Sequence, residues 1–170
     1  MAVMDLIKQR YSLRSFAKRK VEQEKLDKIL EAGRLAPTAK NIQPQHIYVL
    51  QNEYINKAAK ASPCTYGAPI VLAICYDTGT VFTNSRNRVD FGCQDTSIVI
   101  VNMMLQATEL GLGTCWVGLF DEDALRQELN IPDNLIPVAL LPLGYPGEDA
   151  EPSERHSLRK PLDETIEYLG

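Results

Sequence analysis

A short basic turn near the N-terminus carries the residue types that bind a phosphate group. Arg10, Ser12 and Arg14 lie within five consecutive residues, and Tyr11 stands between the first two. A dianionic phosphate is held by fixed cations together with hydroxyl or amide donors, and this turn offers both. A solvated basic turn that complements the C-terminus of a helix is the alternative interpretation.

A polar segment further along the chain has the features of a ligand-binding loop. It runs from Pro37 to Pro44, and it contains Thr38, Ala39 and Asn41. Because proline fixes its own backbone angle, a loop bounded by two prolines suits the presentation of backbone groups and an amide side chain to a flat ligand. A helix terminator followed by an ordinary turn is the alternative interpretation.

Two more segments carry candidate binding groups. Residues 111–120, GLGTCWVGLF, join a glycine-rich helix end to a short apolar strand, and glycine allows backbone to approach a ligand closely. Residues 158–162, LRKPL, place basic side chains in a charged C-terminal region. The alternatives are a helix cap with a core strand for the first segment and a salt-bridged surface segment for the second.

Taken in order, these four segments resemble the nitroreductase family of flavin mononucleotide (FMN) enzymes, and the resemblance extends over residues 7–168. It implies that Arg10 and Ser12 contact the FMN phosphate, with Tyr11 in the same binding set. It also implies that Arg14 lies nearer the pyrimidine edge of the flavin ring. A cation there stabilises the negative charge of the reduced ring.

The proline-bounded loop is the most specific match to the family. Members share the pattern Ala-Pro-Ser-x-x-Asn-x-Gln-Pro, which this chain follows from Ala36, with threonine in place of serine. An aromatic residue often comes next in the family, and Gln45 stands at that position here. The resemblance therefore implies four cofactor-binding residues in the loop: Pro37, Thr38, Ala39 and Asn41.

The glycine-rich segment and the tail supply the remaining implied contacts. The first is similar to the family sequence Gly-Leu-Gly-Thr-Cys-Trp-Ile-Gly, which runs along one face of the ring, so Val117, Gly118 and Leu119 are implied as cofactor-binding residues. An amide N–H of Gly118 or Leu119 is expected to bond N5, the flavin atom that accepts hydride. Arg159 is expected to return to the phosphate, while Ser157 stands where many members carry another cation.

The pattern of apolar residues predicts an α+β sandwich in which helices cover a mixed, mainly antiparallel sheet, and the resemblance implies three layers. At 170 residues, 45% of them hydrophobic, the chain is expected to form a single FMN-binding domain, 1–170. The predicted helices are 2–9, 22–35, 52–62, 95–110 and 121–129, and the predicted strands are 47–50, 69–76, 114–118 and 136–145. Asn52, Asp95 and Asp121 are expected to begin their helices. Pro137 and Pro142 indicate that the last strand lies at an edge or contains a bulge.

Two regions lack a partner surface within one chain. The helix predicted over 95–110 is apolar nearly all round, so it is expected at the centre of the protein or between subunits. The charged region after Pro146 has no core pattern of its own, and it is stable only on another surface. The resemblance implies a homodimer with sites shared between chains, in which loop 37–41 faces turn 10–14 across the interface and the tail wraps the partner subunit.

Charge and composition argue against several other classes of protein. Six cations lie in residues 1–20, but the net charge of the chain is −4, and its acidic remainder would repel a nucleic acid. No apolar run is long enough to span a membrane and no secretory segment is recognised, so a cytoplasmic protein is expected. With four cysteines, no C-x-x-C and two histidines, no metal site is predicted. Neither a glycine-rich dinucleotide motif nor a Walker sequence is present.

The resemblance implies an FMN-dependent oxidoreductase with ping-pong kinetics. NADH or NADPH gives hydride to the flavin and leaves, and a small electron-poor acceptor such as a nitroaromatic or a quinone then takes its place. No side chain is assigned as a catalytic acid or base, because the cofactor performs the redox chemistry. Two alternatives stay open: another flavin chemistry on this fold, such as reductive dehalogenation or flavin fragmentation, and a flavin-binding protein without enzymatic activity. The first is associated with extra lid elements, for which 170 residues leave little length.

Overall fold

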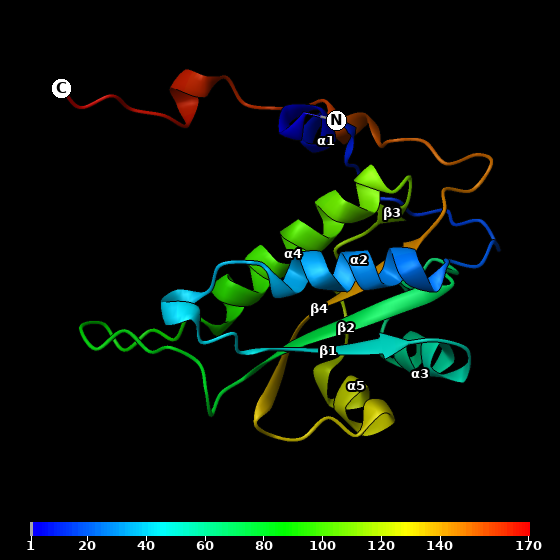
Figure 1. Ribbon diagram of the computed structural model, residues 1–170, viewed down its shortest axis with the longest axis horizontal. Coiled ribbons are helices and arrows are strands. Elements are labelled where there is room, and N and C mark those ends of the chain that lie inside the picture. The colour runs from blue at the N-terminus through cyan, green and yellow to red at the C-terminus, as the bar shows by residue number, and fades with distance from the viewer. Residues whose placement is uncertain (1) are drawn as a thin grey trace.

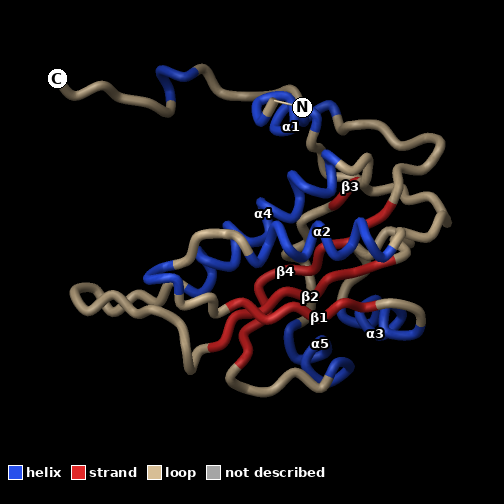
Figure 2. The backbone as a smooth tube through the Cα atoms, in the orientation of Figure 1, coloured by secondary structure: helices blue, strands red, loops and turns tan. Residues whose placement is uncertain are grey.

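The computed structural model describes residues 2–170, which form a three-layer α+β sandwich as predicted (Figure 1). The sheet has the strand order β1-β2-β4-β3, and neighbouring strands are antiparallel. Helices α2 and α4 cover one face, while α3 and α5 cover the other (Figure 2). The helices are α1 (Val3–Gln9), α2 (Gln23–Arg34), α3 (Glu53–Ala61), α4 (Gly92–Glu109) and α5 (Glu122–Leu129). The strands are β1 (Gln45–Leu50), β2 (Ile70–Asp77), β3 (Gly113–Thr114) and β4 (Leu135–Gly144).

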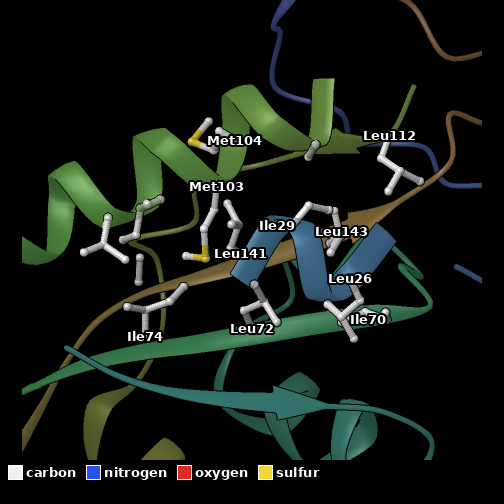
Figure 3. Close-up of a cluster of buried hydrophobic side chains, with 14 of the residues drawn as sticks. Leu26, Ile29, Ile70, Leu72, Ile74, Met103, Met104, Leu112, Leu141 and Leu143 are labelled. Carbon is white, nitrogen blue, oxygen red and sulfur yellow. The ribbon is translucent and has the colours of Figure 1, made fainter. Parts of the chain in front are cut away.

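Strand β2 lies inside the sheet and is buried on both faces, as its continuous apolar run predicts. Because successive side chains point to opposite faces, the strand contributes to two separate hydrophobic clusters. Ile70, Leu72 and Ile74 pack on the side of α2 and α4, and Val71, Ala73 and Cys75 pack on the side of α3 and α5. Figure 3 shows the first of these clusters, where side chains of the sheet meet those of the two helices.

Helices α2 and α4 pack closely because a glycine stands where they meet. A Cβ atom on Gly33 would lie 2.9 Å from Met103 Cγ and 3.2 Å from Val99 Cγ1, both of them buried. Figure 3 shows Met103 directed from α4 into the cluster between the helices and the sheet. The missing side chain therefore lets α4 lie against α2 with its apolar side chains filling the space between them.

Helix α4 begins at Gly92, three residues before the predicted start at Asp95. Asp90 Oδ1 accepts the Gly92 N–H at 3.1 Å, so a different aspartate satisfies a donor at this helix end. The helix stops before Gly111 as predicted, and that glycine has the positive φ of 74° that commonly terminates helices. No helix within residues 2–170 combines the length and the apolar character needed to cross a membrane.

The two predicted capping residues of α3 and α5 behave differently. Asp121 accepts the Ala124 N–H at 2.9 Å and caps α5 as predicted. Asn52 precedes the first residue of α3 as predicted and has φ of 54°. Its side chain makes no capping hydrogen bond, so the prediction that it caps the helix is wrong. The positive φ shows that Asn52 serves the sharp turn between β1 and α3 instead.

The last two strands differ in part from their predictions. Strand β4 carries a register shift in its pairing with β2 near Pro137, which confirms the bulge, but it lies between β2 and β3 and is not an edge strand. Beyond β3 the predicted strand 114–118 continues only as an isolated bridge between Val117 and Leu140. The N–H groups of Cys115 and Val117 still donate to carbonyls of β4, so the segment leaves the sheet only after Val117.

A polar network ties the start of α2 to the ends of α4 and β4. Lys25 Nζ donates to the Leu110 carbonyl at 3.0 Å and to the Tyr145 hydroxyl at 2.8 Å, and that hydroxyl donates to Glu22 Oε2 at 2.6 Å. Arg19 pairs with Glu22 at 2.8 Å, and its guanidinium lies 3.9 Å from the centre of the Tyr145 ring. Glu22 is therefore the shared acceptor of the network.

The network predicts a pH-dependent contribution of Glu22 to the free energy of unfolding. The hydrogen bond from Tyr145, with that from Arg19, lowers the pKa of Glu22 from its usual 4.5 to about 2. Because the pKa is lowered on folding, the stabilisation is complete above about pH 4.5 and is lost as the pH falls toward 2. We expect Glu22→Gln to lower the urea midpoint near neutral pH and to differ less from the native protein in acid. Glu24→Gln removes the same charge from the same helix turn and serves as the control; an equal effect of both variants would contradict the prediction.

Candidate functional site

The basic turn and the tail come together around one cavity of about 450 Å³. Five residues predicted from the sequence line it: Arg10, Tyr11, Ser12, Arg14 and Arg159. Three tail residues that the sequence reasoning missed complete the lining: Ser153, Arg155 and His156. Segments almost 150 positions apart in the sequence therefore form a common wall, which brings Arg159 to the turn as expected.

Strand β3 positions the basic turn. The Leu13 N–H donates to the Thr114 carbonyl at 2.9 Å, and Ser12 forms a parallel bridge with Thr114. A Cβ atom on Gly113 would lie 2.4 Å from Leu13 Cδ2, so only glycine permits this close approach. The side chain of Leu13 is buried, whereas Arg14 beside it is exposed. The buried Leu13 thus anchors the turn, while Ser12 and Arg14 on either side of it line the cavity.

Contacts with α1 and the basic turn hold the tail in place. His156 Nε2 lies 3.0 Å from the carbonyl oxygen of Lys8, and the His156 ring meets Tyr11 edge-on at 6.3 Å between centroids. Ser153 Oγ accepts the Arg155 N–H at 3.3 Å and caps a short turn. These contacts bring Arg155 into the cavity. A signal was present in the sequence, since Arg155 and His156 lie just before Ser157, where the family pattern has a cation.

The cavity concentrates positive charge without a matching acid. It is lined by four arginines and by no carboxylate. Within residues 2–170 none of the four makes an ion pair, although Arg14 and Arg159 donate to backbone carbonyls beside them. Burial raises the pKa of Tyr11, so its phenol remains a neutral hydrogen-bond donor. This donor set fits a dianionic group such as a phosphate.

The segment after β3 divides into a buried part and an open part. Cys115 and Val117 are buried in the second hydrophobic cluster, and burial raises the pKa of the Cys115 thiol. Gly118 and Leu119 are exposed, and a Cβ atom on Gly118 would meet nothing within 4 Å. Among the described backbone hydrogen bonds, neither residue donates its N–H, while the Leu119 carbonyl accepts from Ser62 Oγ at 2.6 Å. The two N–H groups expected to face a flavin are therefore free for a ligand.

The loop that contains Pro37, Thr38, Ala39 and Asn41 lies apart from the arginine cavity. It contacts the first turn of α4, where the Ala39 N–H donates to Asp95 Oδ1 at 3.0 Å. The basic turn contacts β3, which follows the other end of α4 (Figure 1). Because α4 has 18 residues, its ends are about 27 Å apart. The structure therefore does not bring these four predicted residues to the arginine cavity within one chain, and Val117, Gly118 and Leu119 do not line that cavity either.

The loop is nevertheless a well-defined element. Thr38 Oγ1 accepts the Gln43 N–H at 3.0 Å, which closes the loop on itself. Lys40, Asn41 and Gln43 have φ between 52° and 58°, a region that side chains rarely occupy without support from their surroundings. Pro37 and Asn41 are exposed, so the loop presents its polar groups outward.

Comparison with known proteins decides the family. The profile of the nitroreductase family matches residues 7–63 and 52–145. The chain belongs to the nitroreductase family. A family relative from Methanothermobacter thermautotrophicus, named for an inferred NADH dehydrogenase or NAD(P)H nitroreductase activity, is 36% identical over 160 residues, which cover 88% of this chain and 80% of the relative.

Solved structures of nitroreductase family proteins have the same fold. A family protein from Clostridium difficile 630 is 45% identical, with a TM-score of 0.94, and the match covers 100% of this chain and 99% of that one. A nitroreductase-like protein from Desulfovibrio desulfuricans, solved in complex with FMN, is 26% identical with a TM-score of 0.85, and 100% and 98% of the two chains are covered.

Asp95 is expected to stabilise the loop. Its side chain is 3% exposed and accepts the Ala39 N–H, so Asp95→Ala removes the acceptor and leaves a buried space. We expect a loss of about 1–3 kcal/mol in the free energy of unfolding, measured by urea denaturation. Asp95→Asn keeps an oxygen acceptor of the same shape and should lose less. Equal losses for both variants would show that the hydrogen bond to Ala39 does not account for the effect.

Proposed function

We propose that this chain is an FMN-dependent oxidoreductase that transfers hydride from NADH or NADPH to a small electron-poor acceptor. The observation that carries the proposal is the cavity in which four unpaired arginines converge, within a nitroreductase family fold. The Desulfovibrio desulfuricans structure contains FMN, and a Bacillus subtilis relative, 28% identical over 156 residues, is named FMN reductase [NAD(P)H]. Both relatives support FMN as the ligand of this cavity.

The residues present fit FMN in one arrangement. Arg10, Ser12, Arg155 and Arg159 hold the phosphate, because their charges and hydroxyl group converge on one cavity without competing carboxylates. Arg14 would serve the ring, where its charge would favour the reduced state, and the free N–H groups after Val117 would be donors to the ring edge. When bound, FMN supplies the two-electron chemistry, and the protein supplies orientation and electrostatics.

The acceptor is proposed to be a nitroaromatic or a quinone, bound after the oxidised dinucleotide leaves. We assign no side chain as acid or base for this ping-pong cycle. The raised pKa of the Cys115 thiol keeps it protonated, and its side chain is buried in the core, so it has no role as a nucleophile. The chain's part in the reaction is to bind and orient the reactants.

We propose also that the functional unit is a homodimer in which each site takes groups from both chains. The length of α4 separates the loop from the basic turn in one chain, and a second copy placed against α4 supplies the missing half. Ile98 and Val101 of α4 are 41% and 46% exposed, an apolar stripe that a partner would cover. The tail adds further exposed apolar side chains, at Leu158, Leu162, Ile166, Tyr168 and Leu169, and we propose that it wraps the partner subunit.

The activity is tested by the visible absorption spectrum of the purified protein. We expect a flavin spectrum that bleaches when NADH or NADPH is added without oxygen and returns when a nitroaromatic or a quinone is added. The released cofactor should have the mass of FMN. If neither NADH nor NADPH reduces the flavin, the protein binds a flavin but lacks the proposed activity.

Arg155 is expected to bind the phosphate rather than the ring. We therefore expect Arg155→Ala to raise the Kd for FMN roughly tenfold, as for the loss of one charge-assisted contact, and to leave the Kd for riboflavin unchanged. Quenching of flavin fluorescence measures both constants on the apoprotein. Lys160→Ala, which removes a tail cation paired with Glu164, is the matched control and should change neither constant. An equal weakening of FMN and riboflavin would place Arg155 outside the phosphate site.

The shared site is tested by mixing two inactive variants. Arg10→Ala damages the basic-turn half and Asn41→Ala damages the loop half, so a heterodimer contains one doubly altered site and one intact site. Random exchange should therefore restore about a quarter of the native activity. Mixing Arg10→Ala with Ser12→Ala, which alters the same half twice, should restore none. Recovery in neither mixture, despite demonstrated subunit exchange, would refute a site built from both chains.

A further inference from the structure

An arm of the chain, residues 78–91, projects beyond the sandwich between β2 and α4 (Figure 1, green, at the left). Although its sequence is polar and predicts a loop, the arm has a defined shape. Thr83 and Asp90 form an antiparallel bridge, the Asn84 N–H donates to the Val89 carbonyl at 2.9 Å, and the Arg88 N–H donates to the Asn84 carbonyl at 2.8 Å. The arm is therefore a short hairpin with a closed tip.

The tip displays two arginines. Asn84 Oδ1 accepts the Arg86 N–H at 2.9 Å and Asn87 Oδ1 accepts the Val89 N–H at 3.1 Å, which fixes the backbone on both sides of Arg88. Both arginine side chains are exposed, and within residues 2–170 neither guanidinium makes an ion pair or a side-chain hydrogen bond. The backbone that carries the two cations is therefore ordered before an anion binds, while their side chains remain free to reach it.

The root of the arm is attached to the loop proposed to contact FMN. Phe82 and Phe91 meet edge-to-face with 5.3 Å between ring centroids, and the Phe91 N–H donates to the Phe82 carbonyl at 2.9 Å. Lys40 Nζ lies 4.7 Å from the centre of the Phe82 ring. The arm thus begins beside loop 37–44 and extends outward from it (Figure 2). A ligand bound against loop 37–44 would therefore have the root of the arm beside it.

We infer that Arg86 and Arg88 bind the diphosphate of the dinucleotide that donates hydride. The inference rests on the proposed function, because it takes the nicotinamide to stack on FMN at loop 37–44. The rest of the donor then extends away from the ring, and its doubly anionic diphosphate reaches the region of the arm. Two guanidinium groups on a rigid turn suit this group, since arginine recognises phosphate oxygens through paired hydrogen bonds. The arm would thus give the donor a charged contact away from its nicotinamide.

The test compares hydride donors with and without a diphosphate. We expect Arg86→Ala and Arg88→Ala each to raise the NADH concentration for half-maximal flavin reduction about three- to tenfold, with the limiting rate unchanged. Reduction by the neutral donor 1-benzyl-1,4-dihydronicotinamide should be unaffected. Arg→Lys at either position should restore part of the loss, because charge is retained without the paired hydrogen bonds. Lys57→Ala removes one cation from α3, which covers the face of the sheet opposite to α2 and α4. This variant should leave the half-maximal concentration of both donors unchanged.

A binding measurement separates this inference from the proposed activity. ADP-ribose carries the diphosphate but no nicotinamide, and its Kd, measured by calorimetry on the FMN-loaded protein, should rise by the same factor in the arginine variants. If the arginine variants need equally more NADH and neutral donor for half-maximal reduction, the inference is wrong. It is also wrong if neither the half-maximal NADH concentration nor the Kd for ADP-ribose changes; the arm would then be a candidate contact for an acidic protein partner. Failure of the proposed function has another signature: neither donor reduces the flavin of the native protein.

Discussion

The length of one rigid helix sets the distance between the two candidate binding segments at its ends. Helix α4 runs for 18 residues between the loop that ends at Pro44 and the strand that holds the basic turn. It cannot bend to bring these groups together, because its apolar side chains are packed against α2 and the sheet on one side, with Gly33 giving Met103 its space. If the site uses both ends of the helix, as proposed, another surface has to complete it.

Each end of the helix also makes a polar contact with a distant part of the chain. At the first turn, the buried Asp95 accepts a backbone N–H from the loop. After the last turn, Lys25 donates to the Leu110 carbonyl and to Tyr145, and thereby fixes the chain that leads to β3. The hydrophobic clusters make the helix stable, while these polar contacts determine where the binding segments lie.

The elements of the fold could be predicted because their signals are local. The apolar run of β2, the stripe of Leu26 and Ile29 on α2 and the Asp121 cap all depend on residues near one another in the sequence. The errors have long-range causes. Asp95 does not begin α4 because its carboxylate contacts the distant loop, and strand 114–118 is short because only its first residues and Val117 find partners on β4.

The candidate site could be predicted where it follows a family pattern and not where it depends on folding of the tail. Arg159 was expected beside Arg10, and both line the cavity. Arg155 was missed, since its place there depends on the contact of His156 with a carbonyl 148 positions away. The shape of the arm could not be predicted, because its order comes from asparagine side chains bonded to nearby backbone, which leaves no apolar periodicity to detect.

The contact between His156 and Lys8 also fixes a tautomer. A carbonyl oxygen only accepts hydrogen bonds, so Nε2, at 3.0 Å from it, carries the proton in the neutral ring. With the proton on Nε2, Nδ1 of the neutral ring can only accept a hydrogen bond. His156 therefore joins the tail to α1 through its donor and keeps an acceptor among the arginines that line the cavity.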